Sequence, residues 1–504
     1  MPWSSQAPQF PRPDVRAQIE DALDHSRFAD RWIARVVRSL KVGHLIIETP
    51  SGARVEGKGE IEGPRATLIL HRWRTMRRLM FGGDVGFSEA YMDGDWSTPD
   101  LATLIELAAL NERALSEVTA GRWFKRFLHR VKHLLRANTK SGSRRNIEAH
   151  YDLGNDFYKL WLDPSMTYSS ALYATPKQSL EDAQDNKLAR IMDLLALKGD
   201  ERVLEIGCGW GRLAERLTTE RNTHVTGLTL SPSQLAGAKE RLAKAGAGGK
   251  ADLRLQDYRD VTEKFDRVVS IEMIEAVGEK YWPTYFGKIA DVLKPGGRAV
   301  LQVITIANER FELYRKNADF IQRYIFPGGM LPSDEVMRGQ IRQAGMKFLS
   351  LETFGISYAQ TLNEWNRRFQ RAWPEIEAMG YSKKFKRTWE YYLAYCEGGF
   401  RSGSIDVGLY VMEKPAHLPR PRASQHSANE DTLLRAGAIW RFRHRSGHME
   451  SRACPSRGSG QNASARHRSR HDAYRHRGDV WLGPRRGDHR RSHRRTPRQG
   501  ICGL

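Results

Sequence analysis

The sequence has few cysteines and no long apolar run. Only four cysteines occur in 504 residues, and their spacing fits neither a disulfide framework nor a set of metal ligands: Cys208, Cys396, Cys454 and Cys502. This pattern excludes a disulfide-stabilised secreted scaffold, indicates no metal site and favours a reducing cytoplasm. No stretch of about eighteen apolar residues is present, so we expect no segment that spans a bilayer. The proline-rich N-terminus lacks the apolar core of a secretory signal.

Acidic residues are also in deficit, with 59 Asp and Glu against 81 Lys and Arg and a net charge of +22. The excess is uneven, because beyond Lys414 there is no lysine and 20 arginines stand against six acidic residues. Residues 416–504 are rich in Arg, His, Ser, Gly and Pro without sustained periodicity, which predicts an Arg-rich tail of low order. Since this tail lacks interleaved aromatic residues and a known binding module, we expect no nucleic-acid binding.

Hydrophobic residues make up 40% of the chain and charged residues 28%, the balance of a globular protein of more than one domain. Three regions precede the main domain: a flexible leader at 1–25, a small α+β domain at 26–120, and a basic amphipathic helix with a linker at 121–146. In the last region, residues 122–136 place apolar side chains at helical spacing between Lys and Arg. Such a helix either lies on an anionic membrane surface or packs its apolar stripe on the next domain.

A catalytic domain is expected at 147–415, where strands and helices alternate as in a parallel α/β sheet. The predicted strands lie at 202–206, 224–228, 251–255, 265–271 and 298–304, and the predicted helices at 213–220, 233–245 and 281–293. In the smaller domain the predicted elements are a helix at 28–40, extended segments at 44–48, 53–61 and 66–71, and a helix at 101–110. The order of elements predicts a Rossmann-like α/β fold.

The strongest local signal is the run Val-Leu-Glu-Ile-Gly-Cys-Gly-Trp-Gly at 203–211, where a buried strand leads through Gly207, Gly209 and Gly211 into a helix. Glycine permits a tight turn and close approach of a ligand to the backbone. Dinucleotide enzymes and ordinary turns share such a loop. Here, however, Glu205 at the strand end suits the amino group of a methionine moiety, the spacing is shorter than in a pyrophosphate loop, and no Walker lysine follows. These features favour S-adenosylmethionine over NAD.

The second strand lacks the acid that usually holds the ribose hydroxyls. The chain reads Gly-Leu-Thr-Leu-Ser-Pro-Ser-Gln at 227–234, so polar side chains must supply these hydrogen bonds: Thr229, Ser231 and Gln234. The alternative is an ordinary helix start, at which Ser231 or Ser233 is the N-cap.

Further motifs follow one another along the chain, and they are His150-Tyr-Asp-Leu-Gly-Asn-Asp-Phe-Tyr158, Met166-Thr-Tyr-Ser169, Leu255-Gln-Asp-Tyr-Arg-Asp260, Tyr324-Ile-Phe-Pro-Gly-Gly-Met-Leu-Pro332 and Trp373-Pro-Glu-Ile376. With them the chain resembles the cyclopropane-fatty-acyl-phospholipid synthases and the related mycolic-acid cyclopropane synthases over residues 147–414, and more weakly in the N-terminal domain. The resemblance implies transfer of a methylene group from S-adenosylmethionine to the cis double bond of an unsaturated phospholipid acyl chain, which gives a cyclopropane fatty acid.

The resemblance also implies where the cofactor binds. Tyr168 and Ser169 match the contact that precedes the sheet, and the segment from Glu205 to Gly211 matches the glycine loop. Residues 229–234 match the contact after the second strand. The matches on the adenine side are Asp257 and Tyr258.

For the chemistry, the resemblance implies a bicarbonate ion as the base, held by a glutamate, a histidine, a tyrosine and cysteines. Glu275 matches the glutamate, Tyr358 the tyrosine and Cys396 one cysteine. Ser170 stands where the family usually has another cysteine, and Gln302 where it usually has histidine. Serine and glutamine still hydrogen-bond an anion, so bicarbonate stays open. Proton loss elsewhere on the cation would instead give a methylene- or methyl-branched chain without ring closure.

Each match has a structural alternative. Glu275 is otherwise a solvated acid at a helix start near Glu272 and Glu279, Tyr358 a core aromatic, and Cys396 a small buried hydrophobe. A carbocation on the acyl chain also needs a dry aromatic pocket. The candidates for its walls are Tyr168, Tyr281, Trp282, Tyr324 and Phe326.

A substrate in a bilayer requires docking on the membrane surface. The basic stretch at 71–80 and the helix at 122–136 supply positive charge for it. We therefore expect a cytoplasmic enzyme peripherally associated with the inner face of a phospholipid membrane, and a homodimer stays open. The rival interpretation, a small-molecule or RNA methyltransferase, is opposed by the absence of an N/D-P-P-Y motif.

Overall fold

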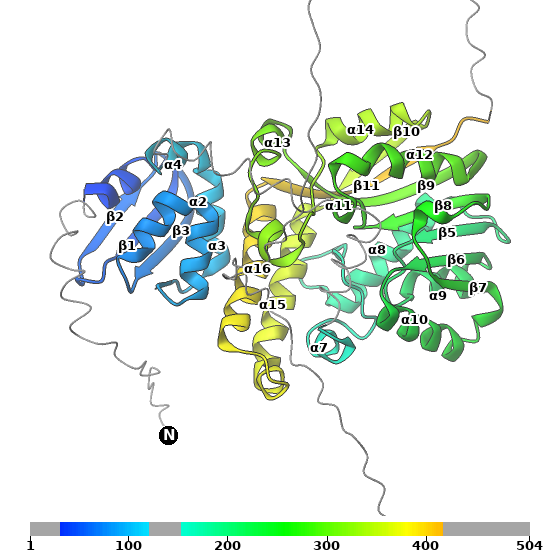
Figure 1. Ribbon diagram of the computed structural model, residues 1–504, viewed down its shortest axis with the longest axis horizontal. Helices are drawn as coiled ribbons and strands as arrows, with labels where there is room; N and C mark the ends of the chain where they lie inside the picture. Colours follow the sequence, from blue (N-terminus) through cyan, green and yellow to red (C-terminus); the bar gives the residue numbers. More distant parts are fainter. Residues whose placement is uncertain (1–30, 120–152, 417–504) are drawn as a thin grey trace, which may run out of the picture. The chain divides into compact units, whose positions relative to one another are not determined.

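The computed structural model describes residues 31–119 and 153–416, which belong to one compact unit (Figure 1). The predicted leader at 1–25, the basic helix at 122–136 and the tail beyond residue 416 lie outside the described residues, so these interpretations stay predictions. Within the described ranges, no helix is both long enough and apolar enough to cross a membrane.

The first described part, residues 31–119, contains a four-stranded sheet with the strand order β2-β1-β3-β4. Its elements are a helix over residues 31–38, within the predicted helix at 28–40, and β1 (Val42–Glu48), β2 (Arg54–Lys58), β3 (Ile61–Leu70), α2 (Arg74–Met92), β4 (Trp96–Ser97), α3 (Leu101–Leu110) and α4 (Glu112–Thr119). The three predicted extended segments correspond to β1, β2 and β3. The predicted helix at 101–110 is confirmed as α3, and Asp100 caps it by accepting a hydrogen bond from the N–H of Thr103 at 3.0 Å.

The basic stretch at 71–80 forms the start of α2, and its arginines have a structural role. Arg72, Arg74 and Arg78 lie 3.2, 2.6 and 3.3 Å from the carboxylate oxygens of Asp95, whose side chain is fully buried. A buried carboxylate needs such compensation. Three of the positive charges that were expected to meet lipid are therefore paired with a buried carboxylate of the protein.

The second described part, residues 153–416, is built on a seven-stranded sheet with the order β10-β11-β9-β8-β5-β6-β7. The strands are β5 (Arg202–Ile206), β6 (His224–Thr229), β7 (Ala251–Leu255), β8 (Phe265–Ile271), β9 (Leu293–Ile306), β10 (Lys347–Thr353) and β11 (Ile405–Glu413). The helices are α7 (Asn155–Lys159), α8 (Leu180–Leu194), α9 (Arg212–Glu220), α10 (Pro232–Lys244), α11 (Ile274–Val277), α12 (Trp282–Val292), α13 (Asn308–Tyr314), α14 (Asp334–Gln343), α15 (Gly355–Ala378) and α16 (Lys383–Arg401).

The five predicted strands are confirmed as β5 to β9, and their neighbours in the sheet pair in parallel. Two further strands, β10 and β11, were not predicted, and β11 is antiparallel to both β9 and β10. The reason lies in α15 and α16, which pack on each other as a helical hairpin. Two antiparallel helices return the chain to the edge where β10 ended, so β11 starts there and runs the opposite way.

Successive side chains of the central strands pack on opposite faces of the sheet. Val203 of β5 lies in a core cluster with side chains of α8, α9 and α10. Its neighbour Leu204 lies in another cluster, with side chains of α12 and α14. This alternation is what strands covered on both faces require. Helices thus cover both faces of the sheet (Figure 1), and the loops at the carboxyl ends of β5, β6 and β8 are left to form a site.

Candidate active site

The glycine loop joins β5 to α9 in the middle of the sheet. Gly207, Gly209 and Gly211 have φ angles of 87°, 52° and 80°, in the left-handed region that glycine tolerates. A Cβ atom on Gly211 would lie 2.9 Å from the Cβ atom of Ala238 in α10. The N–H of Gly207 also donates to the carbonyl oxygen of Leu228 in β6 at 2.9 Å. Both backbone conformation and packing therefore require glycine at the end of this loop.

Glu205 lies in β5 directly before this loop, and its side chain is buried at the cavity wall. Among the described residues, no donor reaches its Oε2 atom. Burial raises the pKa of this carboxyl to about 8, and the positive charge of Lys187 opposes that shift. A buried acceptor with one unused oxygen beside a glycine loop suits an ammonium group, such as that of a methionine moiety.

The three polar residues predicted after β6 have different roles. The Oγ1 atom of Thr229 donates to the Oε1 atom of Gln234 at 3.0 Å, and both side chains line the cavity. The Oγ atom of Ser231 accepts from the N–H of Gln234 and forms the N-cap of α10. Thr229 and Gln234 thus remain candidates for the ribose hydroxyls, whereas the position of Ser231 fits the N-cap alternative.

On the expected adenine side, Tyr258 lines the cavity together with its neighbour Gln256. Asp257 instead forms an ion pair with Arg259 at 2.6 Å, and both of its carboxylate oxygens accept hydrogen bonds from that guanidinium group. Gln256 was not predicted from the sequence as a site residue. Its position directly before the Asp-Tyr motif is the only signal that could have found it.

The segment before α8 brings Tyr168 and Ser169 to the same cavity. The hydroxyl of Tyr168 is hydrogen-bonded to that of Tyr392 at 2.9 Å. The Oγ atom of Ser169 accepts from the Nζ atom of Lys187 at 2.7 Å. Lys187, which the sequence analysis missed, is fully buried in α8. Its place on the apolar face of α8, four residues before Ile191, was the available signal.

Burial lowers the pKa of Lys187 to about 8, and three nearby negative charges oppose this shift, those of Glu272, Asp163 and Glu205. The lysine therefore remains mostly charged at neutral pH. It places one buried positive charge near the acid beside the glycine loop and near a second acid at the end of β8.

This second acid, Glu272, was not predicted, and three of the five predicted catalytic residues converge on it. Its Oε1 atom accepts from the N–H of Ser170 at 2.9 Å and from the Nε2 atom of Gln302 at 2.7 Å. Its Oε2 atom accepts from the hydroxyl of Tyr358 at 2.6 Å. The hydroxyl of Ser170 donates to the carbonyl oxygen of Ala171 instead, so Ser170 contributes through its backbone.

Glu272 directly follows β8, and part of its surface faces the cavity while protein atoms enclose the rest. Burial raises the pKa of its carboxyl, and the hydrogen bonds from Tyr358 and Ser170 and the charge of Lys187 oppose this. Its φ angle of 49° lies in a region that residues other than glycine rarely adopt. A strained backbone of this kind tends to mark functional sites.

Glu275 lies one helical turn further along, in α11. Its Oε1 atom accepts from the N–H of Ile304 at 2.6 Å, and no donor in the described part of the chain reaches its Oε2 atom. Burial, followed by the negative charge of Glu272, raises the pKa of Glu275 to about 8. The two carboxyls are thereby differentiated: Glu272 has three donors that favour its ionised form, while Glu275 is suited to hold a proton at neutral pH.

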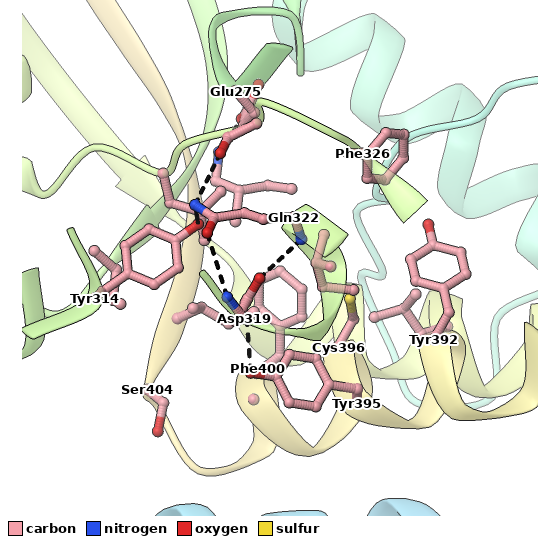
Figure 2. A pocket seen from close by; sticks show the side chains of 18 of the residues that line it. Glu275, Tyr314, Asp319, Gln322, Phe326, Tyr392, Tyr395, Cys396, Phe400 and Ser404 are labelled. Atoms are coloured by element: carbon pink, nitrogen blue, oxygen red, sulfur yellow. Dashed lines mark hydrogen bonds between the residues drawn. The ribbon is translucent and has the colours of Figure 1, made fainter. Parts of the chain in front are cut away.

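Cys396 in α16 faces the same cavity. Burial and the nearby charges of Asp319 and Glu272 raise the pKa of its thiol, so it is a neutral group and a poor nucleophile. Asp319 accepts from the N–H of Gln322 at 2.9 Å, and burial raises its pKa to about 6. Figure 2 shows these groups gathered around one space with four side chains of α16, which are Tyr392, Tyr395, Cys396 and Phe400.

The glycine loop and the side chains of Glu205, Glu272, Glu275, Asp319 and Cys396 line one cavity of about 1890 Å³. Pockets for a single small ligand usually measure roughly 300–1,000 Å³, so there is room for a nucleotide-sized molecule and a long apolar chain. Beyond the glycine loop and Glu272, the aromatic lining comprises Phe326, Tyr391, Tyr392, Tyr395 and Phe400. Apolar side chains of the first described part continue it, including Leu45, Ile47, Leu68, Leu70 and Leu104.

Of the five aromatic residues predicted as walls, Tyr168 and Phe326 line this cavity. Tyr281 instead packs under the guanidinium group of Arg259, and Trp282 is buried in the core. Tyr324 donates its hydroxyl to a carboxylate oxygen of Glu89. Four further aromatic residues of the lining come from α16, a helix that was not predicted from the sequence.

The residues do not fit a bicarbonate ion as the resemblance implied. The N–H of Ser170, the amide of Gln302 and the hydroxyl of Tyr358 all donate to Glu272 already. An anion at that position would meet a carboxylate instead of three donors. Glu275 and Cys396, the other two matched groups, lie at the same cavity but are suited to remain neutral.

The α/β sheet, the glycine loop after Glu205 and the large cavity define an S-adenosylmethionine-dependent methyltransferase. Among solved structures, the mycolic acid cyclopropane synthase CmaA1 complexed with SAH and CTAB is similar, with a TM-score of 0.51 and 29% identity over 54% of this chain and 98% of that one. Residues 138–409 match the family described as mycolic acid cyclopropane synthetase. The chain belongs to this family of lipid methyltransferases.

Two relatives have names that describe different lipid-modifying reactions. The tuberculostearic acid methyltransferase UfaA1 of Mycobacterium tuberculosis is 38% identical over 359 residues, which are 69% of this chain and 84% of that protein. The cyclopropane-fatty-acyl-phospholipid synthase of Escherichia coli is 39% identical over 350 residues, which are 67% of this chain and 85% of that protein. The identities to the two relatives are nearly equal.

Proposed function

We propose that this chain transfers a methylene group from S-adenosylmethionine to the cis double bond of an unsaturated phospholipid acyl chain and gives a cyclopropane fatty acid. The observation that carries the proposal is the single cavity in which the glycine loop, a carboxylate and an aromatic, apolar wall meet. The identity of 39% to a cyclopropane-fatty-acyl-phospholipid synthase supports it.

S-adenosylmethionine, when bound, supplies an electrophilic methyl group on a sulfonium. The unused oxygen of Glu205 suits the ammonium group of the cofactor. The turn at Gly207 and Gly209 lets the backbone of the loop approach the cofactor closely. Thr229 and Gln234 suit the ribose hydroxyls, and the adenine side is left to Gln256 and Tyr258. The loop lies where the strand order reverses between β5 and β8, the usual place for a nucleotide in such a sheet.

The aromatic wall serves the reacting acyl chain. When the double bond takes up the methyl group, a positive charge develops on the neighbouring carbon. The faces of Tyr392 and Phe400 can stabilise such a cation, and the apolar lining keeps out water that would capture it. Loss of a proton from the new methyl group then lets its C–H electron pair form the third bond of the ring.

A second candidate product is a methylene-branched chain. In that reaction a hydride moves from the methylated carbon to the cation before the proton is lost, and the C–H electron pair forms a double bond. A methyl branch would additionally require a separate hydride donor. The 38% identity to a tuberculostearic acid methyltransferase and the glutamine at position 302 favour this alternative.

For access to lipid, we propose peripheral docking on a membrane surface. Phe81 is 76% exposed and lies between Leu79 and Gly82, which line the cavity. Leu313 is 58% exposed and lines the cavity itself. Exposed apolar side chains at the rim of a lipid-sized cavity suit insertion among acyl chains. A cytoplasmic location at the inner face of the membrane and a homodimer remain expectations from the sequence.

The test is mass spectrometry of vesicles that contain unsaturated phospholipid, incubated with the protein and S-adenosylmethionine carrying a trideuterated methyl group. We expect an acyl product that keeps two of the three deuterium atoms. Deuterium NMR then separates the two products, because only in the methylene-branched chain are the two retained deuterium atoms olefinic. Vesicles of saturated phospholipid are the control, and an absence of label from unsaturated chains would refute the proposed function.

A further inference from the structure

We propose that Glu272 is the proton acceptor of the reaction and that its carboxylate takes the place of a bound bicarbonate ion. The inference rests on the proposed function and adds the group that removes the proton from the transferred methyl group. The residues that were expected to hold an external anion hold a side chain of the protein instead.

The geometry indicates a preformed binding site for an anionic group. Its donors come from three separate parts of the chain: Ser170 from the segment before α8, Gln302 from β9 and Tyr358 from α15. All three reach the same carboxylate, at 2.6 to 2.9 Å. Hydrogen bonds to an ionised group are stronger than neutral ones and fix its orientation. Glu272 is therefore held in place, by donors that favour its ionised form, where the cavity passes from the cofactor loop to the aromatic wall.

The backbone of Glu272 supports a functional origin. Its positive φ angle costs roughly 1–2 kcal/mol for a residue with a Cβ atom. Its N–H donates to the carbonyl oxygen of Gln302 at 2.9 Å, so the backbone and the side chain of these two residues are bonded at once. Glycine would fit this backbone without strain. A glutamate here is explained by what its carboxylate does in the cavity.

The proton and electron balance is simple. A C–H bond of the transferred methyl group breaks, and its proton goes to a carboxylate oxygen of Glu272. The electron pair of that bond forms the last ring bond, or the double bond of the branched product. The sulfur keeps the electron pair of the broken S–C bond. Glu272 becomes a carboxylic acid and returns its proton to solvent through the cavity, while Lys187 nearby favours its recovery as a carboxylate.

Other acids at the cavity are less suited to this role. Glu275 and Cys396 are held in their neutral forms by burial and by neighbouring negative charge. Asp319 is held less tightly than Glu272, since it accepts from the N–H of Gln322 at 2.9 Å and from the hydroxyl of Tyr395 at 3.5 Å. Glu205 lies beside the glycine loop, where its unused oxygen suits the cofactor.

The experiment compares the complete chain with two variants in buffer purged of carbon dioxide and in buffer with added bicarbonate. The wild-type rate should agree within about twofold in the two buffers. Glu272→Gln keeps the volume but cannot accept the proton, so its rate should fall about 10²- to 10⁴-fold in both. Glu272→Gly frees the three donors and relaxes the positive φ angle. Its rate should be equally low without bicarbonate and recover at least about tenfold with it.

Calorimetric titration with S-adenosylhomocysteine distinguishes a catalytic role of Glu272 from a merely structural one, because loss of a structural role would weaken binding of this ligand. Both variants should bind it within about threefold of wild type, which shows an intact fold. A wild-type enzyme that makes product only with bicarbonate would overturn this inference and leave the proposed function standing. Wild-type activity in Glu272→Gln, or a comparable loss only in Asp319→Asn, would also overturn it. If the wild type makes no methylated lipid in either buffer, the proposed function itself fails.

Discussion

The Nε2 atom of Gln302 lies 2.7 Å from the Oε1 atom of Glu272, and this contact joins two neighbouring strands at the centre of the site. A histidine was expected at position 302 from the family resemblance. An imidazole can donate or accept a hydrogen bond, depending on its tautomer and on pH, whereas an amide N–H₂ group always donates. The glutamine is therefore matched to a carboxylate that belongs to the protein. Ser170, the other position that differs from the family, donates to the same carboxylate through its backbone N–H.

Stability without ligand should decrease as the pH rises. Burial raises the pKa values of Glu205 and Glu275 to about 8, from an ordinary value of 4.5. Between these values the folded chain holds protons that the unfolded chain has released, so raising the pH favours unfolding. We expect Glu275→Gln to have a shallower decrease of the melting temperature between pH 5 and pH 8. Glu377→Gln, at an exposed position of α15, is the control, and identical slopes would contradict the assignment.

Lys187 should set the pH dependence of activity. Lys187→Met keeps most of the volume but removes the buried positive charge near Glu272 and the hydrogen bond to Ser169. Both carboxyls near the lysine then become weaker acids, so the rise of the rate with pH should shift to higher pH. Ser169→Ala, which keeps the charge, should shift the profile less, and exposed Lys198→Met should not shift it. Rate measurements across pH decide this, and an unmoved profile in Lys187→Met would rule it out.

Gly211→Ala should weaken cofactor binding. The new Cβ atom would lie 2.9 Å from the Cβ atom of Ala238, and alanine is strained at a φ angle of 80°. We expect a loss of about 1–3 kcal/mol in stability and at least about tenfold weaker binding of S-adenosylhomocysteine. Gly249→Ala is the matched control, since its Cβ atom would meet nothing within 4 Å. Calorimetry and thermal melts measure both effects, and wild-type affinity in Gly211→Ala would speak against the site.

Exposed apolar residues at the cavity rim should govern vesicle binding. An apolar side chain that leaves water contributes about 1.5–3 kcal/mol, so replacing Phe81 and Leu313 together by Asp should weaken binding to anionic vesicles at least about tenfold. Ile356→Asp is the control, because Ile356 is 69% exposed and neither Ile356 nor its neighbours Gly355 and Ser357 line the cavity, whereas Phe81 directly precedes Gly82 of the lining. Co-sedimentation at low and high salt is the measurement. Equal losses in the double variant and the control would contradict docking at this rim.

The sequence by itself determined the central sheet, the cofactor class and the family. The strands from β5 to β9 could be predicted because short apolar runs between turn residues are local patterns. The glycine loop was readable for the same reason, since Gly207, Gly209 and Gly211 follow a strand directly. The antiparallel direction of β11 was not predictable, because it depends on where a distant helical hairpin returns the chain.

Only the tertiary structure decided what the carboxylates do. Glu272 and Glu275 lie three residues apart in the sequence, and nothing local distinguishes them. Their difference comes from donors on distant segments, because Tyr358 and Gln302 reach Glu272 while a backbone N–H at Ile304 reaches Glu275. Hydrogen bonds act over about 3 Å, and which groups come that close is a property of the folded chain. For the same reason the buried charge of Lys187 became visible only in the fold.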